Sequence, residues 1–307
     1  MQRDHTHRME SRLESTLVDA TDNPKERRWY PRFRSVLRFL PLLPLLAFVA
    51  IGLVGPMVIP ADPDEQELLN RLQPPAWSGG SWHHPLGTDG LGRDLLARVA
   101  DGAQFSLLIG VIAAVNAGVI GVMLGAFAGL AGGWTDRVIT SLVTVEMAIP
   151  AIVIGIVITA TLGQGLLNLI VILLLGGWIV YARIVRLQAL ALRRSEFVEA
   201  AYALGAGRFY VLWRHLLPNL APTILVLFAQ GIAAVMVYEA TLTYLGLGLP
   251  IESVTLGSLV REGQQVVFSA WWAGFFPGIM IALAVVGFNF LADWIQARMR
   301  IDRIADM

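Results

Sequence analysis

Long apolar stretches alternate with shorter polar segments along this chain. Six of them reach the roughly 20 apolar residues that a helix needs to cross the hydrocarbon layer of a membrane. They are residues 37–60, 106–131, 138–161, 166–188, 220–245 and 273–295. Because backbone polar groups in lipid must be satisfied within each segment, these stretches predict helices rather than strands. The pattern therefore predicts an all-α polytopic membrane protein with six transmembrane helices.

Positive residues are distributed unevenly among the segments that join the six stretches. With six spans both ends of the chain lie on one side, and that side carries 19 of the 23 Lys and Arg residues. The other four are Arg71, Arg93, Arg98 and Arg261. Since cytoplasmic segments carry the excess of positive charge, the distribution predicts that both termini are cytoplasmic, an N-in, C-in topology.

The spans divide the chain into consecutive segments. Residues 1–35 are polar and of mixed charge, and we expect them to form a mostly disordered cytosolic tail. The first transmembrane helix follows at 36–60, an external loop at 61–105, a membrane core at 106–297 and a cytosolic tail at 298–307. Within the loop, the stretch LGRDLLARVADGA (91–103) has apolar residues at helical spacing, which predicts a helix along the outer membrane surface.

Composition narrows the chemistry that the chain itself can perform. The chain has no cysteine, which excludes thiolate catalysis and metal sites with cysteine ligands. Its one lysine, Lys25, does not follow a glycine-rich loop, so a P-loop for ATP is excluded as well. Any ATP that drives this chain is therefore hydrolysed by another subunit. His83 and His84 are adjacent but have no third ligand nearby, so we expect no metal site.

A short amphipathic segment at about 195–219, EAAYALGAGRFYVLWRHLLPN from residue 199 onward, lies on the cytoplasmic side between the fourth and fifth spans. Ser195 is placed to cap a short helix, and Gly205 is placed to end it in a left-handed conformation. A second short helix is expected at 207–216, and Pro218 suits the first turn of the fifth span. A helix with a small-residue face can dock into a groove on another protein.

The spacing of this segment resembles the EAA loop of bacterial ATP-binding-cassette (ABC) importer permeases. The matching residues are Glu199, Ala200, Ala201, Leu204, Gly205, His215, Leu217 and Pro218. In that family the loop is the coupling helix that docks on the ATPase subunit. The resemblance therefore implies that these residues couple this chain to an ATPase.

Two further stretches resemble the C-type subunit of the dipeptide, oligopeptide and nickel permease group. They are HPLGTDGLGRDLLARVADGAQFSLLIG (84–110) and YEATLTYLGLGLP (238–250). The signature residues in the external loop are His84, Gly87, Thr88, Asp89, Gly92, Arg93 and Asp94. The resemblance covers about residues 37–297.

The resemblance implies a type I ABC importer transmembrane domain in the bacterial cytoplasmic (inner) membrane. Its partners would be a homologous B-type permease, two ABC ATPase subunits or one fused ATPase, an extracytoplasmic substrate-binding protein and membrane lipid, with no nucleic acid. The chain itself would be no enzyme and hold no cofactor, since ATP and Mg²⁺ would bind to the partner ATPases. It would form part of a route for di- and oligopeptides.

The sequence leaves alternatives for both the substrate and the class of protein. Nickel chelates or glutathione-like solutes could be the substrate, because the same permease group takes them. A self-sufficient secondary transporter is a less favoured reading, since internal repeats are not evident and an EAA loop has no role in that mechanism. A membrane-embedded enzyme would need a catalytic cluster at membrane depth, and the sequence has no intramembrane histidine or cysteine.

Two acidic residues, Glu146 and Glu239, fall within apolar spans. Intramembrane carboxylates are costly and mark functional sites by default, so both are candidates for the wall of a translocation pathway. The alternative for each is a structural carboxylate, either near a span end or hydrogen-bonded to the partner permease. Pro150 follows Glu146 closely and predicts a kink in the third span.

Two other patterns each have two interpretations. Gly121, Gly125 and Gly129 form a double GxxxG motif, which favours close helix packing either inside the chain or between subunits. Asp89, Arg93 and Asp94 could stabilise the external loop or contact a substrate or binding protein. We favour the structural reading for both patterns.

Overall fold

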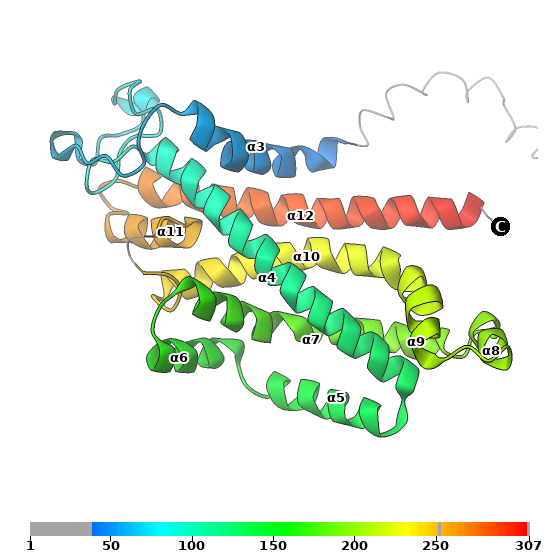
Figure 1. Ribbon diagram of the computed structural model, residues 1–307. Coiled ribbons are helices and arrows are strands. Elements are labelled where there is room, and N and C mark those ends of the chain that lie inside the picture. The colour runs from blue at the N-terminus through cyan, green and yellow to red at the C-terminus, as the bar shows by residue number, and fades with distance from the viewer. Residues whose placement is uncertain (1–38, 251–252, 306–307) are drawn as a thin grey trace, which may run out of the picture. The chain divides into compact units, whose positions relative to one another are not determined.

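The computed structural model describes residues 39–250 and 253–305, and the predicted tail at 1–35 lies outside these ranges (Figure 1). Helix α3 (Leu43–Val58) is followed by α4 (Leu95–Ala131), α5 (Gly133–Met147), α6 (Ala151–Leu162) and α7 (Leu166–Leu192). Then come α8 (Glu196–Ala203), α9 (Arg208–Val211), the π-helical turn η5 (Leu212–Leu216), α10 (Leu217–Tyr244), α11 (Leu256–Gln265) and α12 (Trp272–Ala305). Short 3₁₀ turns lie at Leu40–Leu42, Leu68–Asn70 and Ala76–Ser78.

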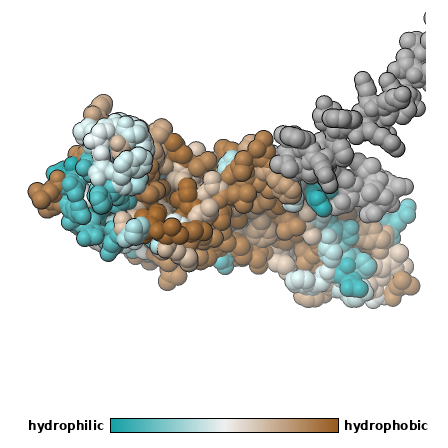
Figure 2. Space-filling model, turned by 90° about the horizontal axis from the view of Figure 1, so that it is seen from above, coloured by the Kyte–Doolittle hydropathy of each residue, from teal (hydrophilic) through white to brown (hydrophobic). Residues whose placement is uncertain are grey.

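The number of apolar helices agrees with the prediction. Five helices are long and apolar enough to cross a membrane, and α5 with α6 makes a sixth span if the two are taken as one bent element. The two helices meet at an angle of 80°, and Pro150 lies in the break between them, so the predicted kink is confirmed. Figure 2 shows apolar side chains covering the middle of the visible face, with hydrophilic groups gathered toward its ends.

The helices from α3 onward run roughly lengthwise, and their connections gather at two ends (Figure 1). The start of α3, the turn after α4, the α8–α9 segment and the end of α12 lie at one end. The loop 59–94 and α11 lie at the other. This alternation fits six spans whose first and last ends share one side, and the α8–α9 side is the one rich in arginine.

Helix α4 is the central element of this arrangement. In its most apolar stretch of 18 residues, 50% is buried inside the chain. The corresponding share is 11% for the first span, which contains α3. The contact of α4 with α7 depends on the double GxxxG motif. A Cβ at Gly125 would lie 2.9 Å from Ala182 Cα, and one at Gly129 would lie 2.6 Å from Ala189 Cβ. The motif therefore packs α4 against α7 within the chain, as we favoured from the sequence.

The helix predicted at 91–103 is present from Leu95 onward, but its placement along the membrane surface is wrong in this structure. Residues from Leu95 onward form the first turns of α4, and Asp94 caps that helix by accepting a hydrogen bond of 2.8 Å from the Ala97 N–H. Leu95, Val99 and Ala103 are buried in a core shared with α11 and α12. The apolar face that fitted a membrane surface equally well is thus covered by protein.

Two further elements differ from the sequence prediction. Helix α11 was not predicted, and it begins at a capping box in which Thr255 and Ser258 exchange hydrogen bonds of side chain and backbone. Serine at the third helical position, in place of the usual Glu or Gln, made this signal hard to recognise. Helix α12 continues to Ala305, so most of the segment 298–307 extends the last helix.

The α4–α7 contact yields a test of the fold. We expect Gly125→Leu to destabilise the detergent-solubilised chain by about 1–3 kcal/mol or more, because the new side chain meets the α7 backbone. Gly278→Leu in α12 is the matched control, since a Cβ there meets nothing within 4 Å. Thermal unfolding measures both variants, and equal stabilities would contradict the close α4–α7 packing.

Candidate functional site

The segment expected to couple the chain to a partner is built around the end of helix α8. Gly205 has a φ of +87°, which confirms the predicted left-handed helix end. Its N–H donates to the Tyr202 carbonyl at 2.9 Å, and the Ala206 N–H donates to the Ala201 carbonyl at 3.0 Å. This pair of bonds is a Schellman motif, which reverses the chain sharply toward α9.

The start of α8 differs from the prediction. Ser195 occupies the cap position, but its hydroxyl donates to the Leu192 carbonyl at 2.6 Å and makes no side-chain cap. The Ser195 carbonyl instead accepts the Val198 N–H at 3.0 Å. The Ser195 hydroxyl therefore stabilises the turn that follows α7 and does not cap α8.

The expected coupling residues divide into a buried and an exposed set. Ala201 is 8% exposed and packs with Val198 and Val211, so the EAA triplet does not form one continuous face. Glu199, Ala200, Gly205 and Pro218 are exposed, and His215 and Leu217 are half-buried. Leu204 is 89% exposed at the tip of the turn. We call the exposed residues Ala200, Ala203, Leu204 and Gly205 the tip surface.

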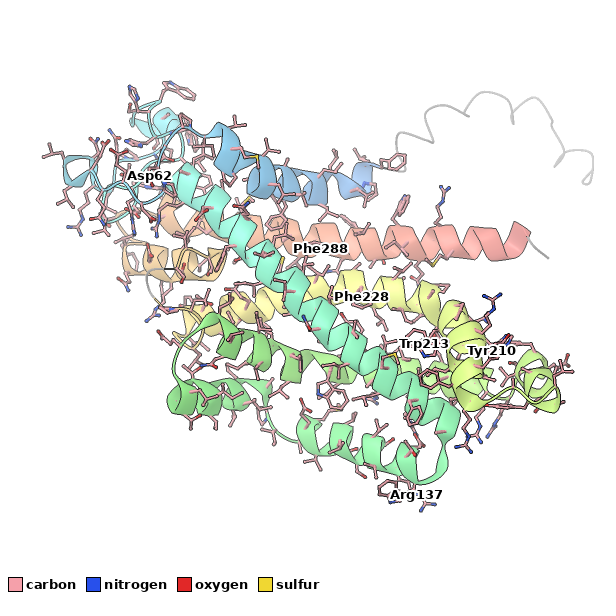
Figure 3. All side chains as sticks on the ribbon, in the orientation of Figure 1. Asp62, Arg137, Tyr210, Trp213, Phe228 and Phe288 are labelled. Atoms are coloured by element: carbon pink, nitrogen blue, oxygen red, sulfur yellow. The ribbon has the colours of Figure 1, made fainter. Side chains whose placement is uncertain are left out.

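The coupling segment is fixed to the membrane helices by a shared apolar core. Val198 of α8, Val211 of α9 and Leu216 of η5 are fully buried in one cluster with residues of α4 and α7. Exposed aromatic side chains of the same segment, Tyr210 and Trp213, lie around α9 (Figure 3). Because interiors pack at high density, a displacement of α8 must move the helices to which it is packed.

At the opposite end, an ion network holds the signature residues of the external loop. Arg98 of α4 is 1% exposed and contacts Asp89 Oδ2 and Glu262 Oε2, both at 2.6 Å from its Nη1. Arg93 donates to Asp89 at 2.7 Å and to Glu262 at 3.1 Å. Glu262 lies on α11, so the network joins the loop to two helices.

Asp89 is the centre of this network. Burial opposes its ionisation, but the N–H groups of Leu91 and Arg93 and the charge of Arg98 outweigh that effect and lower the pKa of Asp89 below its usual 3.8. Asp89 therefore remains a carboxylate at neutral pH, and its role here is to hold the loop. This geometry agrees with the structural reading of Asp89 and Arg93.

The other signature residues shape the same loop. Thr88 is fully buried, accepts the Gln73 N–H at 2.8 Å and receives the Trp272 indole N–H on its carbonyl at 3.2 Å. Gly87 and Gly92 have φ values of +84° and +79°, which favour glycine at both turns. The signature residues are neighbours in the sequence, but the sequence did not predict that Trp272 contacts them.

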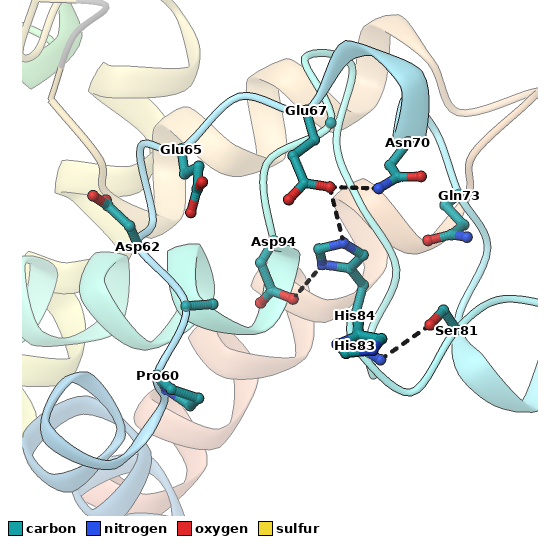
Figure 4. Close-up of a pocket in the computed structure, with 12 residues that line it drawn as sticks. Pro60, Asp62, Glu65, Glu67, Asn70, Gln73, Ser81, His83, His84 and Asp94 are labelled. Atoms are coloured by element: carbon teal, nitrogen blue, oxygen red, sulfur yellow. Dashed lines mark hydrogen bonds and ion pairs between the residues drawn. The ribbon is translucent and has the colours of Figure 1, made fainter.

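A polar hollow of about 440 Å³ opens beside the network (Figure 4). In it His84 Nδ1 lies 2.9 Å from Asp94 Oδ2, and its Nε2 lies 3.9 Å from Glu67 Oε2. His83 donates its backbone N–H to the Ser81 hydroxyl at 3.2 Å. Within the described ranges, histidine, aspartate and glutamate form no group arranged to hold a metal ion.

Glu239 of α10 is placed inside the chain. Its side chain is fully buried, and its carboxylate accepts hydrogen bonds from the Thr243 hydroxyl at 2.9 Å and the Ser106 hydroxyl at 3.3 Å. Ser106 also accepts the Leu256 N–H at 3.1 Å, which ties α4, α10 and α11 together. In this conformation Glu239 has no surface with which to line a pathway, so the geometry favours the structural alternative.

Glu146 lies in a different setting, at the end of α5 beside the break. Its Oε2 accepts the Trp178 indole N–H at 2.9 Å, whereas its Oε1 is buried without a hydrogen-bond partner. A buried oxygen without a partner is costly, and each such group in a folded chain calls for an explanation. Glu146 therefore remains a candidate for the pathway.

The sequence did not identify Arg98 and Glu262 as partners. Arg98 lies in the signature stretch, but Glu262 is 164 residues away on a helix that was not predicted. Only the tertiary arrangement brings the two charges together.

Comparisons with known proteins give a consistent result. Residues 121–301 match the family described as binding-protein-dependent transport system inner membrane component. The chain is 35% identical over 266 residues to the oligopeptide transport system permease protein OppC of Bacillus subtilis, covering 86% of each chain. It is also 35% identical over 252 residues to the probable D,D-dipeptide transport system permease protein DdpC of Escherichia coli, covering 82% of this chain and 83% of that protein.

Among solved structures, the fold resembles a chain of the MetNI methionine ABC transporter in an inward-facing conformation. The TM-score is 0.55 at 21% sequence identity, over 66% of this chain and 95% of the other. At this identity the likeness concerns the fold alone.

The lowered pKa of Asp89 predicts how the external loop responds to acid. Its stabilising contribution is complete above the unfolded pKa of about 4 and is lost as the pH falls through the lower folded value. We expect Asp89→Asn to be less stable at pH 7 and to lose less stability than the wild type below pH 4. Unfolding in detergent across this pH range measures both effects, with Glu65→Gln on the exposed part of the loop as control.

Identical acid profiles for wild type and Asp89→Asn would show that the Asp89 carboxylate does not hold the loop.

Proposed function

Because the chain belongs to the family of binding-protein-dependent transport system inner membrane components, we propose that it is the C-type permease subunit of an ABC importer for di- and oligopeptides. It is a multi-pass protein of the bacterial inner membrane, and it translocates rather than catalyses. The observation that carries the proposal is the tip surface, an exposed helix end whose base is buried in the same core as two membrane helices.

The mechanism follows from that attachment. An ATPase that binds the tip surface moves α8 when it closes on ATP. The buried side chains of Val198, Val211 and Leu216 carry this motion to α4 and α7, since a packed core cannot absorb it by compression. The membrane helices then move, and the substrate pathway that was open to one side of the membrane opens to the other side. ATP and Mg²⁺ bind to the ATPase, and this chain supplies the mechanical connection.

The partners of the complete importer are also part of the proposal. A homologous B-type permease pairs with this chain, two ATPases or one fused ATPase bind the cytoplasmic side, and a substrate-binding protein delivers peptide at the external side. The names of the relatives support a peptide substrate. Nickel chelates and glutathione-like solutes are the alternative cargo.

Purification of the tagged subunit in mild detergent tests the assembly. We expect mass spectrometry to identify a second permease, P-loop ATPases and a peptide-type binding protein in the purified sample. Recovery of the chain alone, active in liposomes on an ion gradient without ATP, would overturn the proposal in favour of a secondary transporter.

The tip surface yields a test of coupling. We expect Gly205→Glu to reduce ATP-driven peptide uptake at least about tenfold while the subunit still inserts, because a side chain at a φ of +87° strains the turn and a charge blocks docking. Gly163→Glu is the matched control. Gly163 also ends a helix with a positive φ, +81°, and a Cβ there meets nothing within 4 Å, but it lies after α6 at the opposite end.

The measurements are uptake in proteoliposomes and the amount of ATPase that co-purifies. Normal uptake and normal ATPase association in Gly205→Glu would show that the tip surface is not the coupling site.

A further inference from the structure

A hollow of about 280 Å³ lies between α7, α10 and the first residue of α6. Most of its lining is apolar and includes Leu173, Leu227 and Val235. Two tyrosines, Tyr181 of α7 and Tyr238 of α10, also line it. We call this hollow the tyrosine pocket.

The two tyrosines cross between the helices in opposite directions, and each rests on a glycine of the other helix. A Cβ at Gly231 of α10 would collide with the Tyr181 ring and hydroxyl. A Cβ at Gly176 of α7 would lie 3.2 Å from Tyr238 Cε1. The two glycines therefore leave the space that both tyrosine rings occupy, and larger residues at these positions would displace the rings.

Both hydroxyl groups lack a hydrogen-bond partner. Tyr181 is 3% exposed, and its oxygen and that of Tyr238 are buried without a bond to any other group of the chain. Burying a hydroxyl in this way costs free energy that a phenylalanine in the same place would not. Packing alone therefore accounts for the aromatic rings but not for the hydroxyls.

The surroundings of the pocket are suited to a ligand that enters from outside the chain. Val180, Gln230, Ala234 and Ala151 are exposed along its opening, so the pocket is open at one side. Gln230 adds an amide that both donates and accepts hydrogen bonds. Ala151 follows the α5–α6 break, where the unpartnered oxygen of Glu146 is also found. Buried polar atoms without partners therefore occur on each of α5, α7 and α10.

We propose that the tyrosine pocket is a binding subsite for the peptide backbone of the substrate, in which the Tyr181 and Tyr238 hydroxyls donate hydrogen bonds to substrate carbonyl groups. The inference rests on the proposed function and names a site for it. The backbone is the part that all peptides share, so bonds to its carbonyls serve cargo of varied sequence. The apolar lining accepts a side chain without selecting one. A lipid acyl chain carries no hydrogen-bond acceptor, so it would leave both hydroxyls unsatisfied.

Conservative substitutions separate this role from a structural one. Tyr181→Phe and Tyr238→Phe keep the rings that lie on Gly231 and Gly176 and remove only the hydroxyls. We expect the stability and assembly of the complete importer to be unchanged or slightly higher, since an unpartnered group is removed. We expect each variant to lower the efficiency of ATP-driven trialanine uptake about threefold to tenfold, the effect of one lost hydrogen bond.

A modified substrate identifies the bonded atom. Trialanine with a thioamide in place of the first of its two amides is a weaker acceptor at that position. The wild-type importer should take it up less efficiently than trialanine, and at least one of the two phenylalanine variants should discriminate less between them. All samples contain the same binding protein. Its preference between the two peptides therefore cancels when the uptake ratios of wild type and variants are compared. Tyr244→Phe, at the end of α10 and outside the pocket lining, is the control.

Each outcome decides the question. Wild-type uptake by both phenylalanine variants would overturn the subsite and leave the peptide importer intact. Lower stability or failed assembly of the variants would show instead that the hydroxyls bond to the partner permease. A wild-type complex that takes up neither trialanine nor dialanine, although it hydrolyses ATP, would overturn the proposed function and this inference with it.

Discussion

The structure depends above all on the close approach of α4 and α7. Gly121, Gly125 and Gly129 leave no side chain between the two helices, so α4 lies against the backbone of α7 itself. In a membrane the hydrophobic effect does not draw helices together, and close packing of this kind takes its place. The contact fixes α7, and α7 in turn carries Trp178 and Tyr181 and leads directly into the coupling segment.

Polar groups in the described parts of the chain are used in two distinct ways. In the external part charged side chains pair with one another, as in the bonds among Asp89, Arg98 and Glu262, although Arg98 Nε and Gln73 Oε1 keep no hydrogen bond. Such a network gives the loop one arrangement, because removing Asp89 or Glu262 takes away one of the two ion pairs of the buried Arg98. Along α5, α7 and α10 the opposite holds, since Glu146, Tyr181 and Tyr238 each keep a buried oxygen without a bond. The first pattern is that of a fixed support, and the second is that of a surface prepared for contact.

The sequence predicted the parts of this fold that depend on local chemistry. Span length, the kink at Pro150 and the left-handed turn at Gly205 each follow from a few neighbouring residues. The prediction from the sequence failed where one local pattern fitted two structures equally well. The apolar face of 95–103 fits lipid as well as protein, and Ser195 could bond forward or backward along the chain. It could not find the partner of Arg98 or the burial of Glu239, because both depend on helices brought together from distant parts of the sequence.

The continuity of α4 has a mechanical consequence. A helix of 37 residues is about 55 Å long at a rise of about 1.5 Å per residue, which exceeds the roughly 30 Å of the hydrocarbon layer. One end is held by the Asp94 cap and by the ion pair of Arg98 with Asp89 of the external loop, and the other reaches Gly132 close to the cytoplasmic segment. A rotation of this helix at one membrane face therefore displaces its end at the other face. A tilt of about 5° about one end displaces the other by about 5 Å at this length, so small rotations outside become shifts inside as large as one helical turn.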